Sequence, residues 1–195
     1  MPSKTPDQSL DQASGQSLCH TSETSCPISK SLTSERLFLR PFTVEDGDLL
    51  FRLYGNKDVM AIRKIGTQSR QGSDSQLAII TDHWQRRGFG LWAVFDRDSG
   101  TFMGECGLRE ENETDDKVEL SYGLLPEFWG GGLATEAAAT VLDFGIKALG
   151  MKQIYAFAQK KNAASLHILS KFGFQHEFDF DEDGDVITRT VLMVD

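Results

Sequence analysis

The sequence predicts an α+β protein built on a mixed sheet. Short segments alternate between apolar and polar residues, which is the period of a strand. Longer segments carry apolar residues at helical spacing, above all the alanine-rich stretch that follows residue 132. Strands come in runs and are followed by helix, strand and helix, an order that differs from a repeating βαβ protein.

The N-terminal part of the chain divides into a tail and the first folded elements. Residues 1–31 are rich in Ser, Thr and Gln and have few large aliphatic side chains, so we expect a disordered tail before a domain at 32–195. Leu37 and Leu39 alternate with Arg36, Phe38 and Arg40 in a strand over 33–41. Thr43 can cap a helix that buries Leu49, Leu50 and Leu53, and a second helix covers roughly 75–87. Residues 55–74 show few order signals and are expected to form a mobile connection.

The remaining elements follow from the same patterns. Gly150 and Gly173 are suited to end helices, because glycine readily adopts the left-handed conformation found there. Asn162 is a favourable helix cap. We expect strands over 91–95, 102–108, 118–125, 154–158, 174–180 and 186–194, and helices over 133–149 and from 162 to 173.

Composition limits the classes of function. The chain has 195 residues and a net charge of −9 (20 basic against 29 acidic residues), which argues against nucleic acid and anionic membranes as partners. No apolar run is long enough for a membrane span or a secretory signal. The cysteines, Cys19, Cys26 and Cys106, are too few for a disulfide framework, so a reducing cytoplasm is expected. Cys19, His20 and Cys26 fall short of a tetrahedral metal site, and no metal is predicted.

One segment points to chemistry. Trp129-Gly130-Gly131-Gly132-Leu133-Ala134-Thr135-Glu136 joins a strand to the alanine-rich helix. Glycines let the backbone turn tightly, so successive N–H groups can point into one concavity at the positive end of a helix, which suits a pyrophosphate. The segment lacks the lysine of a P-loop and the third glycine or alanine of the dinucleotide fingerprint.

This segment resembles the acetyl-CoA pyrophosphate loop of the GNAT superfamily of N-acetyltransferases, in the branch of the ribosomal-protein-alanine acetyltransferases. Further similarities are Phe102 to Leu108, Glu119 to Leu124, Asn162 to Ser165 and Lys171 to Phe174. Trp129 stands where the family usually has Gln or Arg. The resemblance implies a mostly antiparallel sheet flanked by helices, with a V-shaped splay between the fourth and fifth strands.

The resemblance also implies a site for acetyl-CoA as cosubstrate. The pantetheine arm would pair with the main chain of Leu124 and Leu125, and Asn162 would lie at its far side. The pyrophosphate would bind the loop from Gly130 to Thr135, that is, Gly130, Gly131, Gly132, Leu133, Ala134 and Thr135. Homodimers are common in this family, so a homodimer is also an expectation.

The reaction that the resemblance implies is attack of an amine on a thioester, and it needs a base because an unperturbed amine is mostly protonated at neutral pH. Glu119, on the fourth strand, is the first candidate, and Glu105 on the neighbouring strand is the second. The tyrosine that many relatives use as acid is Leu169 here. In this branch of the family Ser165 faces the same region, so the resemblance makes it the candidate acid, with a hydrogen bond to the backbone as its alternative role.

The expected activity is transfer of an acetyl group from acetyl-CoA to a primary amine, either a protein N-terminus or a small molecule. Two alternatives stay open from the sequence: a non-catalytic acyl-CoA-binding sensor or scaffold, and a nucleotide-binding protein.

Overall fold

The computed structural model describes residues 31–63, 65–112 and 115–194, which form an eight-stranded sheet in the order β1-β2-β3-β4-β5-β6-β8-β7. Neighbouring strands are antiparallel except β5 and β6, which are parallel. The predicted mixed, mostly antiparallel sheet is confirmed. The strands are Leu32–Thr33 (β1), Leu37–Pro41 (β2), Leu91–Asp96 (β3), Phe102–Asn112 (β4), Asp115–Leu124 (β5), Gln153–Gln159 (β6), Gln175–Glu182 (β7) and Asp185–Met193 (β8).

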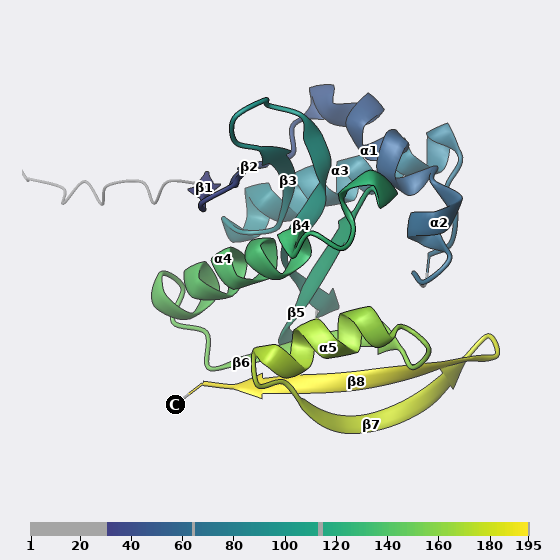
Figure 1. Ribbon diagram of the computed structural model, residues 1–195, viewed down its shortest axis with the longest axis vertical. Helices are drawn as coiled ribbons and strands as arrows, with labels where there is room; N and C mark the ends of the chain where they lie inside the picture. Colours follow the sequence, from purple (N-terminus) through teal and green to yellow (C-terminus); the bar gives the residue numbers. More distant parts are fainter. Residues whose placement is uncertain (1–30, 64, 113–114, 195) are drawn as a thin grey trace, which may run out of the picture.

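The helices lie around this sheet. Figure 1 shows α4 crossing β4 and β5, and α5 lying against the C-terminal strands. The α-helices are Gly47–Tyr54 (α1), Lys57–Met60 (α2), Arg70–Arg87 (α3), Leu133–Lys147 (α4) and Ala163–Lys171 (α5), and the 3-10 helices are Val44–Asp46 (η1) and Pro126–Phe128 (η2). Within the described residues, no helix is both long and apolar enough to span a bilayer.

The prediction of a mobile connection over 55–74 is wrong where that segment contains helix, namely in α2 and in the first residues of α3. Asn56 accepts hydrogen bonds from the N–H groups of Asp58 and Val59 and so begins α2. Ser69 accepts a bond from Gly72, so α3 begins at Arg70, five residues earlier than expected. Polar capping residues, which resemble loop residues in composition, start both helices.

The helix expected after Thr43 begins with a 3-10 turn. The Thr43 N–H donates to the Asp46 carboxylate at 2.7 Å, so the acidic residue caps this turn, and α1 follows it. Leu50 and Leu53 are fully buried, as predicted. The predicted tail, residues 1–31, lies outside the described residues except for Ser31.

The core lies between the sheet and its helices. Leu37 and Leu39 are fully buried, which confirms the alternation of β2. Trp92 packs edge-on against Trp84 and Phe144, so these aromatic side chains belong to the core.

The sheet opens between β5 and β6. These two strands pair at a single register position, Glu119 with Tyr155, whereas β4 and β5 pair along most of their length. The expected splay between the fourth and fifth strands of the family corresponds to this opening.

Candidate active site

The glycine loop has the backbone conformation that its sequence predicts. Gly130 and Gly132 have φ of +79° and +75°, a region that residues with a Cβ rarely adopt. A Cβ on Gly130 would meet no atom within 4 Å. The glycine is therefore required by the backbone conformation and not by crowding.

The loop leads into the N-terminus of α4. The first bond of the helix runs from the Glu136 N–H to the Gly132 carbonyl at 3.0 Å. The N–H groups of Leu133, Ala134 and Thr135 consequently have no acceptor within the helix. With the helix dipole, they provide a positive end suited to an anion.

Arg36, which the sequence did not single out, contacts this loop. Its guanidinium donates to the Gly131 carbonyl at 2.9 Å and pairs with Glu136 at 2.7 Å. Burial alone would raise the pKa of Glu136, but hydrogen bonds from Ser34 and Arg36 lower it. Arg36 is half-exposed, and its positive charge is paired with the carboxylate of Glu136, so its contribution to the loop is the hydrogen bond to the Gly131 carbonyl. About a hundred residues separate the partners, and no local pattern reveals such a pairing.

Some main-chain groups at the end of β5 already form hydrogen bonds within the protein. The Leu125 N–H donates to the Met103 carbonyl, and the Leu125 carbonyl accepts from Phe128. Successive residues of a strand direct their main-chain groups to opposite edges, so those of Leu124 face away from β4 and into the opening. The indole N–H of Trp129 donates to the Leu124 carbonyl at 2.7 Å. Pairing of Leu124 and Leu125 with a pantetheine arm stays a prediction.

Glu119 lies where β5 and β6 meet. It stands directly across from Arg109 of β4, and the two side chains form an ion pair at 3.0 Å. The Glu119 side chain is 11% exposed and that of Arg109 is 44% exposed. The carboxylate is thus shielded but within reach of solvent. The arginine pKa is raised, chiefly by this carboxylate.

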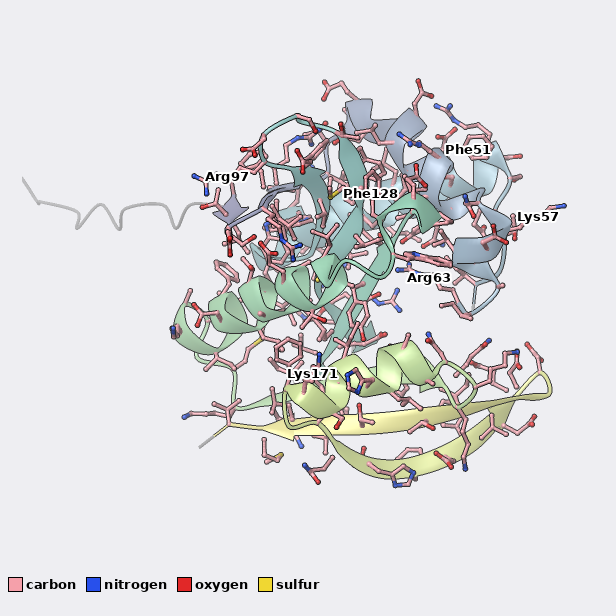
Figure 2. All side chains as sticks on the ribbon, viewed as in Figure 1. Phe51, Lys57, Arg63, Arg97, Phe128 and Lys171 are labelled. Atoms are coloured by element: carbon pink, nitrogen blue, oxygen red, sulfur yellow. The ribbon has the colours of Figure 1, made fainter. Side chains whose placement is uncertain are left out.

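Glu105, the second candidate base, is fully buried. It accepts a hydrogen bond from the Tyr54 hydroxyl at 2.9 Å and pairs with Arg63 at 2.6 Å. Figure 2 shows Arg63 in the region between α2 and the sheet. Burial and the neighbouring carboxylate raise the pKa of Tyr54 far above its ordinary value, so the phenol remains a donor. A Cβ on Gly123 would collide with the Arg63 guanidinium, so this glycine makes room for the ion pair.

Ser165 lies on the other side of the sheet from Glu119. Its hydroxyl lies 2.8 Å from that of Tyr122 on β5, and its N–H donates to the cap residue Asn162 at 3.1 Å. Glu119 and Tyr122 are three residues apart in a regular strand, so their side chains point to opposite faces. The structure therefore does not pair Glu119 with Ser165. Burial raises the pKa of Tyr122 to about 12.

The other predicted site features have clear positions. Asn162 caps α5, as predicted, and its expected role beside the pantetheine arm stays a prediction. Within residues 31–63, 65–112 and 115–194, no cluster of three His, Cys, Asp or Glu side chains is arranged to hold a metal ion. Cys19 and Cys26 lie outside the described residues. Cys106 is buried and forms no disulfide bond.

Comparisons with known proteins agree with this geometry. Residues 36–175 match the acetyltransferase (GNAT) domain family. The chain is 29% identical over 150 residues to the uncharacterized N-acetyltransferase YoaA of Bacillus subtilis, a match that covers 75% of this chain and 83% of YoaA. It is 32% identical over 92 residues to spermidine N(1)-acetyltransferase of Escherichia coli K12, covering 43% of this chain and 50% of that enzyme.

The fold is also similar to solved structures. RimL, a ribosomal-protein alpha-N-acetyltransferase solved with coenzyme A, superimposes with a TM-score of 0.72 at 15% identity, over 84% of this chain and 98% of RimL. The match to the family model spans most of the chain and includes the glycine loop, the opening of the sheet and both candidate bases. The chain therefore belongs to the GNAT family and is an acetyltransferase.

Proposed function

We propose that this enzyme transfers the acetyl group of acetyl-CoA to a primary amine by direct attack in a ternary complex. The observation that carries the proposal is the exposed glycine loop, with Gly130 and Gly132 at positive φ, placed at the start of α4 beside the opening between β5 and β6. Primary amines are the acceptor class because the names of the relatives include a spermidine and a protein N-acetyltransferase.

The cosubstrate would be held by main-chain groups. The N–H groups of the loop, from Gly130 to Thr135, would bind the pyrophosphate, and Arg36 would hold the loop in place through the Gly131 carbonyl. Leu124, Leu125 and Asn162 would contact the pantetheine arm in the opening. Bound acetyl-CoA supplies the activated acyl group as a thioester.

Glu119 is the base that the geometry favours. An amine with a pKa near ~10 arrives mostly protonated and must lose a proton to attack. Glu119 is partly accessible, whereas Glu105 is fully buried and bonded to both Tyr54 and Arg63. Glu119 would accept the amine proton directly or through a water molecule. The neutral amine attacks the thioester carbon to give a tetrahedral intermediate. This intermediate collapses to the amide as the C–S bond breaks, and the nitrogen loses its second proton to water.

Ser165 would donate a proton to the departing sulfur from the α5 side of the opening, opposite to the side from which Glu119 takes the amine proton, and would take a replacement from water. Its hydroxyl is positioned by the hydrogen bond with Tyr122 at 2.8 Å, across the opening from β5 to α5. Tyr122 would act as a positioning residue through this hydrogen bond.

A thiol-release assay with a panel of peptides and small amines tests the proposal. We expect the release of free coenzyme A to require an amine. Glu119→Gln should lower kcat/KM by about 10²- to 10⁴-fold near neutral pH, the effect of losing a general base.

Ser165→Ala should reduce kcat less, because binding and orientation of the reactants persist. Asp82→Asn, on the exposed surface of α3, serves as the control. Unchanged rates of Glu119→Gln at every pH would remove Glu119 from the mechanism.

A further inference from the structure

Trp129 is placed to act on the cosubstrate. It is the residue directly before the glycine loop, and its side chain is 52% exposed. The short helix η2 folds the chain back, so that the indole N–H donates to the Leu124 carbonyl five residues earlier. Trp84 and Trp92 are buried, so Trp129 is the one exposed tryptophan among the described residues.

The bonded carbonyl faces the opening of the sheet. Leu125 directs its N–H to Met103 on β4, and Leu124 therefore directs its own N–H and carbonyl to the opposite edge. On that edge the described part of β6 pairs with β5 only at Glu119. The strand edge at Leu124 is consequently available to an extended ligand, except where the indole occupies it.

We propose that Trp129 belongs to the cosubstrate site and competes with the pantetheine arm for the Leu124 carbonyl. The inference rests on the proposed function, since it requires the arm to lie along β5. An arm that pairs with Leu124 in strand fashion takes the carbonyl lone pair directed across the opening. The indole nitrogen, 2.7 Å from this oxygen, holds that position. Binding of coenzyme A releases the indole, and the side chain moves into solvent, where it is already half-exposed.

The test compares two ligands on two proteins. Trp129→Phe keeps an aromatic ring but removes the donor, so coenzyme A should bind about two- to tenfold more tightly, the range expected for removing one competing hydrogen bond. Adenosine 3′-phosphate 5′-diphosphate, which lacks the arm, should bind both proteins equally. Calorimetry measures all four dissociation constants.

Fluorescence supplies a second measurement. Coenzyme A should change the tryptophan emission of the unmodified protein, and the adenosine ligand should not. The change should disappear in Trp129→Phe, because Trp84 and Trp92 remain in the core. Glu127→Gln is the control. It removes an exposed ion pair between Glu127, which lies in η2 close to Trp129, and Arg52 of α1, and it should retain both affinities.

The outcomes separate this inference from the proposed function. If coenzyme A binds Trp129→Phe no more tightly than the unmodified protein, the competition is refuted while the site stands. If coenzyme A produces no emission change although calorimetry detects binding, release of the indole is refuted. Absence of any binding to the unmodified protein would overturn the proposed function itself.

Discussion

The buried ion pair of Glu105 and Arg63 shows how a single charged residue in the core depends on its neighbours. Glu105 has no exposed surface, and its two oxygens are bonded to Tyr54 and Arg63. The Arg63 side chain is 15% exposed and lies against Gly123 of β5. A charge removed from water in this way requires its partner, so each member of the cluster depends on the others.

We expect Arg63→Met to destabilise the protein by about 3–5 kcal/mol, because Glu105 would remain buried without a counter-charge. Urea unfolding at neutral pH measures this loss. Combining it with Glu105→Gln should recover part of the stability, since no buried charge is then left unpaired. A double variant as unstable as Arg63→Met alone would contradict this explanation.

The pKa of Asp46 makes the free energy of unfolding depend on pH. Burial would raise its pKa, but two hydrogen bonds from Arg40, each 2.7 Å, and bonds from Thr43 lower it below the ordinary value. A carboxylate whose pKa is lower in the folded than in the unfolded state stabilises the protein at any pH above its unfolded pKa of ~3.9. This stabilisation is lost as the pH falls through the folded pKa.

Asp46→Asn should therefore cost about 2–3 kcal/mol at pH 7, from the loss of hydrogen bonds to a charged group. The difference from the unmodified protein should shrink below about pH 4, where the carboxylate of the unfolded chain also protonates. Urea unfolding from pH 3 to 7 would measure both. A difference independent of pH would show that the charge of Asp46 contributes nothing.

At the scale of the elements, the sequence predicted the long periodic helices and strands and missed the shortest helix, α2. The periodicity of α4 and of the strands was clear, because one face of each packs in the core. The predicted end of α4, residue 149, is two residues late. The helix α2 has only four residues, too few to show a period, and its signal was the single cap Asn56.

The glycine loop gives a prediction at this scale. Gly130→Ala should reduce stability by about 1–2 kcal/mol, because alanine is strained at a φ of +79°. Gly131→Ala should change it by less than about 1 kcal/mol, since its φ is not in the left-handed region and a Cβ would meet only Leu133 at 3.8 Å. Thermal unfolding of both variants makes the comparison, and equal losses would contradict it.

The candidate site was only partly predictable. The glycine loop, Glu119 and Asn162 come from local motifs, and the structure places them around one opening in the sheet. Arg36, Arg63 and Arg109 were missed because each finds its partner through strand pairing or packing between distant segments. Alternation along β5 directs Glu119 and Tyr122 to opposite faces, and the packing of α5 against Tyr122 puts Ser165 on the face of Tyr122, a contact between segments 43 residues apart.

At the scale of the molecule, ligand binding should act on global stability. Coenzyme A at a hundred times its dissociation constant should raise the free energy of unfolding by about 2.7 kcal/mol, if it binds only the folded chain. Thermal unfolding with increasing ligand measures the effect. An unchanged midpoint at millimolar coenzyme A would contradict the proposed cosubstrate.

The opening between β5 and β6 has a mechanical consequence. The two strands share one paired position, so the N-terminal and C-terminal parts of the sheet are held together there largely by packing and by the covalent link through α4. An acyl donor bound in this opening would contact both parts of the sheet and hold them together for as long as it is bound. After the product leaves, the two parts are held together less firmly. We therefore expect a protease to cut the ligand-free enzyme most readily at 148–152, the segment between α4 and β6.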